Sequence, residues 1–329
     1  GKSGTNGVEV SINQTMQFQA GFIKIPESQT DYGMGWEGFY AFIDGKGGGS
    51  WYDNYGYVWG PKLNQKDPNT PSGWVEVPQY NSPYDPNQLF PFTLSGYSGT
   101  SNYKPMPLIT KGENNLKNFL QNEMLSTTNV SIAGKSDKGN YRISATHLYQ
   151  KGQIPNTKLN STTLQLAGAL SPSEKLRIEG TLSYNRQYTP NYPTTGYGPS
   201  NFFYNILLWM GPDVDVRDLR NYWKPDRTNL EQFTYNYTWY NNPYYLAYEN
   251  LRGYTNNVAT GQAKINYNIN KDLNLALRGG GTLNNSEGDL KTPYGYIDYT
   301  AAPFGQYSLN TGSNMLLNTD LMLTYKMST

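Results

Sequence analysis

Cysteine is missing from the sequence, and histidine occurs once, at His147. Without cysteine there are no disulfides, thiolate zinc sites or cysteine nucleophiles, and one histidine excludes metal motifs built on a histidine pair. A hydrolytic triad could use only His147. An excess of one charge is missing too, because 26 basic and 25 acidic side chains leave a net charge of +1. We therefore predict no metal, no cofactor and no nucleic-acid partner.

Hydrophobic residues are scarce, at 36% of the chain, yet aromatic residues reach 15% and 30 residues are tyrosine. The longest apolar run, residues 202–210, is about half of the roughly 20 residues that a membrane-spanning helix requires. So many aromatic residues argue against disorder. The composition favours a fold that buries one thin apolar layer.

Alternation of apolar and polar residues is the main structural signal, and it predicts an all-β protein. In the segment after Val8, for example, Val8, Val10 and Ile12 alternate with polar neighbours. Eight segments carry the pattern: 8–20, 119–133, 141–145, 163–170, 176–185, 262–269, 273–278 and 320–327.

The connections between these segments alternate in length. Short turns rich in Gly, Pro, Asn and Asp are expected at 134–139, 171–175 and 270–272. Long loops are expected at about 24–117, 187–254 and 284–314, while 151–158 is short for its side. Antiparallel strands with short turns at one end and long loops at the other are typical of a transmembrane β-barrel wall with long extracellular loops.

The two faces of the expected strands differ in charge. One face is aliphatic or aromatic and suits lipid, whereas the other holds charges that a dry core could not accommodate unpaired. We predict that five of these charged residues line a water-filled or plug-filled lumen: Arg142, Arg177, Glu179, Lys264 and Arg278. A soluble antiparallel sheet with one wet face has the same alternation. The expected strand length of about 10–14 residues favours the membrane, because a transmembrane strand needs about 9–11.

Aromatic residues crowd the long loops and are the candidate contacts to a ligand or a partner. Rings with an apolar face and a polar edge suit stacking on sugars or packing against a protein. The alternative is that they pack loop against loop. The candidates are Trp36, Trp51, Tyr55, Trp59, Trp74, Trp209, Trp223, Tyr237, Trp239 and Tyr244.

Three aspartates, Asp213, Asp215 and Asp218, lie close enough in sequence to suggest calcium. Their spacing does not match an EF-hand loop, because the required Gly and Glu are absent. We predict instead a polar turn that caps a short helix.

Several segments, in order, resemble the SusC/RagA family of TonB-dependent outer-membrane transporters. Asn201–Trp223 followed by Asn241-Asn242-Pro243-Tyr244 is similar to the family's extracellular-loop block, and Gly139–Thr157 is similar to one of its hairpins. The resemblance covers nearly the whole chain. It implies that residues 1–329 are part of a barrel of about 22 strands, without the plug domain. A complete eight-stranded barrel is the alternative, although loops of this length would be large for so narrow a cylinder.

The resemblance also implies a function, which is TonB-dependent import of oligosaccharides or oligopeptides across the outer membrane. A SusD-like surface lipoprotein, TonB and outer-membrane lipid would be the partners, and no reaction would be catalysed. On this interpretation the five lumen residues would contact the plug or the substrate path. A soluble or surface carbohydrate-binding or adhesive β protein remains the alternative. An outer-membrane enzyme that pairs a serine with His147 is a third possibility.

Overall fold

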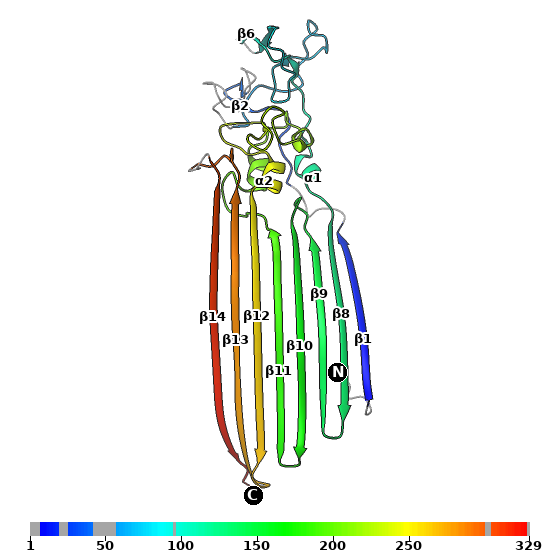
Figure 1. Cartoon of the computed structure of the whole chain (residues 1–329). Coiled ribbons are helices and arrows are strands. Elements are labelled where there is room, and N and C mark those ends of the chain that lie inside the picture. The colour runs from blue at the N-terminus through cyan, green and yellow to red at the C-terminus, as the bar shows by residue number, and fades with distance from the viewer. Residues whose placement is uncertain (1–6, 20–25, 42–56, 95–96, 300–303, 328–329) are drawn as a thin grey trace.

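The computed structural model describes residues 7–19, 26–41, 57–94, 97–299 and 304–327. Its main body is one antiparallel sheet of eight strands, in which every strand pairs with the next long strand along the chain. The order is β1-β8-β9-β10-β11-β12-β13-β14 (Figure 1). The all-β antiparallel prediction is confirmed, and each of the eight alternating segments contributes a strand.

The eight strands are long. They are β1 (Gly7–Gln19), β8 (Glu123–Ser136), β9 (Gly139–Lys151), β10 (Lys158–Ser173), β11 (Leu176–Asn191), β12 (Leu251–Asn268), β13 (Leu273–Thr292) and β14 (Gln306–Tyr325). Their lengths run from 13 residues in β1 and β9 to 20 residues in β13 and β14. Most exceed the predicted 10–14 residues.

Tight turns join the strands at one end of the sheet, and the long connections gather at the other (Figure 1). Only Asp137 and Lys138 separate β8 from β9, and only Glu174 and Lys175 separate β10 from β11. The predicted difference between the two ends is therefore present. The loop bounds differ most at 284–314, because β13 continues to Thr292 and β14 starts at Gln306.

The reason for that difference is chemical. Residues 284–292 and 306–314 are mostly Asn, Ser, Thr and Gly, so they lack the alternation that reveals a strand. They still pair, with Asn284 opposite Asn314 and Thr292 opposite Gln306. Side chains join them as well, since Ser313 Oγ donates to Asn285 Oδ1 at 2.8 Å. A strand with water on both faces needs no apolar alternation.

The long connections fold into a compact body above the sheet (Figure 1). Its described residues form three two-stranded sheets and four short helices. The strands are β2 (Gly35–Trp36), β3 (Phe39–Tyr40), β4 (Glu76–Val77), β5 (Phe90–Leu94), β6 (Tyr97–Ser101) and β7 (Met106–Pro107). The helices are α1 (Asn115–Phe119), η1 (Tyr204–Leu208, a π-helix), η2 (Val216–Arg220, a 3₁₀-helix) and α2 (Pro243–Glu249).

This loop body contains the hydrophobic core of the protein. Its buried residues come from the connections, among them Phe119, Leu219 and Leu246, and the long strands add no residue to this core. Phe119, which we expected at the start of a strand, instead ends α1, because Leu116 and Phe119 are three residues apart and pack the same core. No described helix has the length and apolar character needed to cross a bilayer.

Candidate functional site

One face of the sheet carries a continuous apolar belt. Residues directly opposite each other in antiparallel strands share a face, so the register sorts every side chain into rows. One such row contains only apolar residues across all eight strands: Ile12, Val130, Ala145, Leu164, Tyr184, Ala259, Leu283 and Met315.

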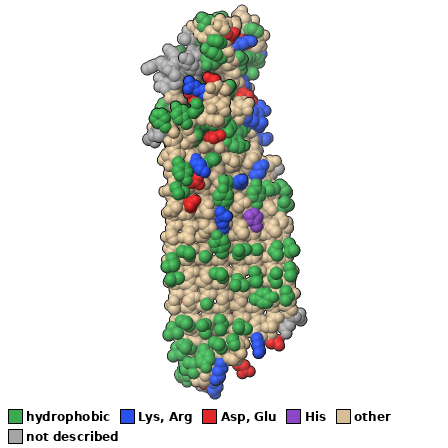
Figure 2. All heavy atoms as spheres, viewed as in Figure 1, with side chains coloured by type: hydrophobic (Ala, Val, Ile, Leu, Met, Phe, Trp, Pro, Cys, Tyr) green, Lys and Arg blue, Asp and Glu red, His purple; other side chains and the backbone are tan. Residues whose placement is uncertain are grey.

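The belt has a sharp upper edge. The next row toward the loops is polar in every strand: Gln14, Thr128, His147, Thr162, Arg186, Asn257, Asn285 and Ser313. Below this row, on the same face, the described strands carry no charged residue down to Leu176, Tyr267 and Tyr325. Figure 2 shows this face, with green side chains in horizontal bands. From Met315 to Tyr325 the belt extends about 33 Å along the strand, at roughly 3.3 Å per residue.

Belt side chains are exposed to a degree that a soluble core would not permit. Ile12, Leu182 and Leu321 are 72%, 54% and 71% accessible. A contiguous apolar surface of this kind marks contact with a membrane or another protein. No second layer of the described chain covers it.

The opposite face carries the charges at the same height. Glu179, Lys264, Arg278 and Asp320 form one row across four neighbouring strands. Arg278 Nε donates to Asp320 Oδ2 at 2.8 Å, and Arg177 Nε donates to Glu179 Oε1 at 2.8 Å. Arg142 lies one row nearer the loops, where its guanidinium donates to Ser131 Oγ at 3.5 Å.

All five residues predicted to line a lumen therefore lie on one face, which we call the charged face. Their partial ion pairing fits a wet surface, since several charges at one level need water or a polar partner. Contact with a plug or a substrate stays a prediction.

A hollow of about 380 Å³ opens where the charged face meets the loop body. Glu123, Gln150 and Leu159 supply its sheet side, and Tyr192 and Phe203 supply its loop side. Gln150 Nε2 donates to Glu123 Oε1 at 2.5 Å, and Gln153, Lys158 and Asn191 also line the hollow.

Most of the predicted aromatic contacts pack within the loop body. Tyr244 is 7% exposed and meets Phe119 edge-on, and Trp223 meets Tyr245 edge-on at 5.3 Å. Trp209 stacks on Tyr240 at 5.9 Å and also touches Tyr57, which in turn contacts Trp36.

Cations cover two further rings, and two rings face outward. Lys66 lies 3.1 Å from the centroid of the Trp74 ring, and Lys224 lies 4.3 Å from that of Tyr237. Trp59 is 62% exposed and Trp239 is 37% exposed. Trp51 and Tyr55 lie outside the described residues. The structure thus leaves Trp59 and Trp239 as the candidates for external contact.

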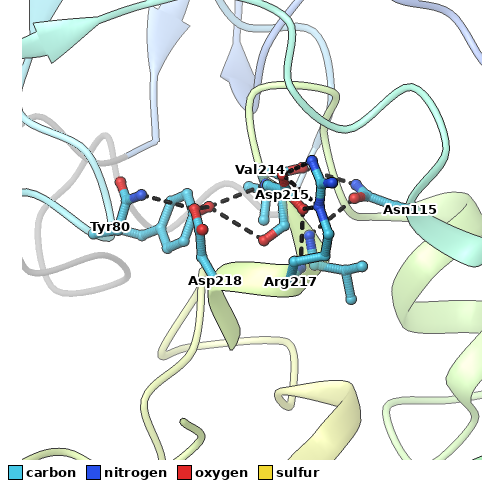
Figure 3. A network of polar contacts seen from close by, with 8 residues as sticks. Tyr80, Asn115, Val214, Asp215, Arg217 and Asp218 are labelled. Carbon is cyan, nitrogen blue, oxygen red and sulfur yellow. Dashed lines mark hydrogen bonds and ion pairs between the residues drawn. The ribbon is translucent and has the colours of Figure 1, made fainter. Parts of the chain in front are cut away.

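The three aspartates occupy separate positions. Asp215 caps η2, its carboxylate accepting the Arg217 N–H at 2.9 Å, which confirms the predicted turn and cap. Tyr80 links two of them, since its hydroxyl donates to Asp218 Oδ2 at 2.9 Å and accepts the Asp215 N–H at 3.0 Å (Figure 3). Within the described ranges, no group of three acidic, histidine or cysteine residues is arranged for a metal ion.

Asp213 is buried and joins two loops. Its Oδ1 accepts the Met34 N–H at 2.9 Å, although 179 positions separate the two residues. Burial raises the pKa of this carboxyl, while the Met34 N–H and the nearby Lys111 ammonium oppose the rise. Burial lowers the pKa of Lys111, whose Nζ donates to Gln79 Oε1 at 2.7 Å.

The raised pKa of Asp213 predicts a pH effect. The carboxyl of Asp213 holds its proton more tightly in the folded protein than in the unfolded chain. The folded protein therefore loses stability as the pH rises from about 3.8, the ordinary pKa of an aspartate, through the raised pKa of Asp213. Asp213→Asn keeps an oxygen for Met34 and removes the charge. The variant should gain stability relative to the wild type above that window and lose the gain at pH 3. Unfolding free energies measured at pH 3 and pH 8 test this, and an equal difference at both values would contradict it.

Asn242 joins separate parts of the second long connection, residues 192–250. In the sequence it stands out only within the Asn241–Tyr244 resemblance. Its Oδ1 accepts the Tyr244 N–H at 2.8 Å as the N-cap of α2, with Pro243 in the first turn. Its Nδ2 donates to the carbonyls of Leu219 and Phe233 at 2.8 and 2.7 Å. Asn before Pro was the available signal, because that pair starts helices.

Asn242→Ala is therefore expected to cost about 2–4 kcal/mol, from a lost cap and two buried carbonyls left without donors. Amide hydrogen exchange across residues 192–250 measures the loss. Asn114→Ala is the matched control, because Asn114 occupies the N-cap position of α1 without a side-chain cap bond. Its effect should stay within about 0.5 kcal/mol. Equal protection in both variants would refute the role of Asn242.

Comparison with known proteins yields structural likeness only. No family model matches the chain, and no curated protein matches it. Among solved structures, a chain of the RagAB peptide importer in the closed-closed state aligns with a TM-score of 0.51 at 16% identity, over 67% of this chain and 24% of that one. A RagAB peptide transporter structure aligns with a TM-score of 0.50 at 16% identity, with the same coverage. The chain spans about a quarter of the length of these structures, and the likeness concerns the fold.

Proposed function

We propose that the chain forms part of the barrel wall of an outer-membrane, TonB-dependent importer of the SusC/RagA type. In this proposal the apolar belt faces lipid and the charged face lines the lumen. A barrel of about 22 strands would enclose a lumen that a plug fills. The chain would catalyse no reaction and hold no cofactor.

The apolar belt is the observation that carries the proposal. Its roughly 33 Å along the strand becomes about 25 Å of height at the tilt of about 40° usual for outer-membrane barrels. That height matches the apolar band of such barrels. A soluble adhesin would need to bury this face, whereas Leu182 and Leu321 in the described structure are mainly accessible.

The two edge strands of the sheet set a further requirement. Among the described strands, β1 and β14 each pair on one side only. In a bilayer unpaired backbone groups cost several kcal/mol each, so the proposal needs further strands against both edges.

The loop body suits a platform for a SusD-like lipoprotein. Its rings pack against each other, which holds the loops in one arrangement, while Trp59 and Trp239 stay accessible for contact. The RagAB structures are described as a peptide importer and a peptide transporter, which supports an oligopeptide as cargo among the oligosaccharides or oligopeptides that the sequence resemblance implies. TonB would supply the energy for import.

Fractionation and uptake test the proposal. The full-length protein should stay in the membrane pellet after a carbonate wash and dissolve only with detergent. Uptake of a labelled oligopeptide or oligosaccharide pool by cells that carry it should stop when TonB is deleted. A protein released without detergent refutes the membrane assignment, and uptake that persists without TonB refutes the transport assignment.

A further inference from the structure

Three basic residues, which we call the basic patch, lie on the same face as the apolar belt and on its loop side, across β9, β10 and β11. Lys151 and Lys158 stand directly opposite each other on β9 and β10. Arg186 lies on β11, in the polar row that also contains His147. All four side chains are exposed. In Figure 2, blue side chains lie above the green bands near the purple histidine.

No acidic residue on the described part of these strands balances this patch. On β8–β11 the belt face carries no described Asp or Glu above the belt, since Glu123 pairs with Gln19 and lies on the charged face. The described carboxylates form no ion pair with Lys151, Lys158 or Arg186. The acids of this face lie on β13, where Asp289 already pairs with Lys291 at 3.2 Å.

The arrangement costs energy unless an anion is present. Like charges directly opposite each other destabilise a strand pair, and Lys151 and Lys158 are such a pair. Arg186 lies against the ring of Tyr188 at 5.8 Å, which leaves its guanidinium free to donate hydrogen bonds outward. Three cations beside an apolar belt are the arrangement that attracts an anionic lipid headgroup.

The cations lie at two depths. Arg186 follows the top belt residue of its strand, Tyr184, by two positions, about 7 Å along the strand. Lys158 is six positions beyond Leu164, about 20 Å along the strand, or roughly 15 Å in height with the usual tilt. A phospholipid headgroup layer is only about 5–8 Å thick. It therefore reaches Arg186 but leaves the two lysines above it.

We propose that the belt face of β9–β11 binds a lipid with a phosphorylated sugar headgroup, whose anionic groups meet Arg186 at one depth and Lys151 with Lys158 at the next. The inference rests on the proposed function, because only membrane insertion brings lipid against this face. Acyl chains would lie on the belt below, along Leu164 and Leu182.

Binding of labelled bisphosphorylated lipid A to the full-length protein in neutral detergent tests the proposal. The variant is Lys151→Ser/Lys158→Ser/Arg186→Ser. The control removes the same charge at the other end of the sheet, in Lys138→Ser/Lys175→Ser/Lys271→Ser, all exposed turn residues. At about fivefold per cation, the first variant should bind about 100-fold more weakly and the control within about twofold of the wild type. Dephosphorylated lipid A should bind all three proteins weakly.

Three outcomes would overturn the proposal. The first is equal binding by the wild type and the first variant. The second is equally tight binding of phosphatidylglycerol, which would indicate a phospholipid at one depth. The third is competition by millimolar inorganic phosphate, which would indicate a free-anion site. The wild type and both variants are also fractionated. Release of the wild-type protein from the membrane without detergent would refute the proposed function, whereas unchanged lipid binding by the first variant would refute only this inference.

Discussion

Leu182→Arg is expected to destabilise the membrane-inserted protein by roughly 1–3 kcal/mol, because an arginine on the lipid face of a barrel costs about 2–4 kcal/mol at the bilayer centre and about 0–1 kcal/mol near the interfaces, and Leu182 lies one row below the upper edge of the belt. Leu182 lies within the apolar belt, between Leu166 and Gly261 on the neighbouring strands. The guanidinium would have no water and no carboxylate within this charge-free part of the face. Urea unfolding from lipid vesicles measures the loss.

Thr181→Arg is the matched control, one residue away on the charged face. Thr181 pairs with Ala167 and Gln262, in the row beside Glu179 and Lys264. An arginine there can remain solvated in a wet lumen, and the expected change is about 0–1 kcal/mol. If both variants lose the same stability, or if Leu182→Arg becomes a more soluble folded monomer, the belt does not face lipid.

Phe119→Ala is expected to cost about 3–5 kcal/mol, but to loosen the loop body and not the sheet. Phe119 is 2% exposed, stacks on Phe202 at 5.5 Å and meets Tyr244 edge-on at 5.2 Å. It therefore joins the first long connection to the second. Limited proteolysis should cut the variant within residues 192–250 while the long strands stay protected.

Phe203→Ala supplies the comparison for this prediction. Phe203 follows Phe202 directly but is 41% exposed. Its removal should change loop stability by about 1–2 kcal/mol, less than half of the loss at Phe119, because only part of its ring is withdrawn from water. Cleavage of both variants at the same rate, or cleavage of the strands first, would contradict a loop core organised around Phe119.

The strand segments could be predicted from the sequence because the belt imposes alternation. Val8, Val10 and Ile12 share one face, and the register matches them with Gly134, Ile132 and Val130. The same logic placed Arg142 and Lys264 together on the other face. Alternation disappears above the belt, where water contacts both faces, so the ends of β13 and β14 could not be recognised.

The contacts within the loop body could not be predicted from the sequence, for a different reason. Its core joins residues far apart in the chain, as Asp213 and Met34 illustrate, and no local pattern encodes such pairs. Tyr244 looked like a contact residue because an aromatic ring serves a core and a binding surface equally well. Only burial separates it from Trp59. Asn242 was visible as a helix start, but not its bonds to Leu219 and Phe233.

The central claim is that the apolar belt faces lipid and the charged face does not, and spin-label accessibility along β11 tests it most directly. Because the sequence has no cysteine, each single-cysteine variant carries its label at one site only. Labels at positions 176–187 of the full-length protein in vesicles would be scanned for collision with oxygen, which concentrates in lipid, and with a water-soluble nickel complex. We predict oxygen maxima at Leu176, Ile178, Leu182 and Tyr184, nickel maxima at the odd positions between them, and loss of the oxygen signal at Arg186. Absence of the two-residue period, or oxygen maxima on the side of Glu179 and Thr181, would contradict the account.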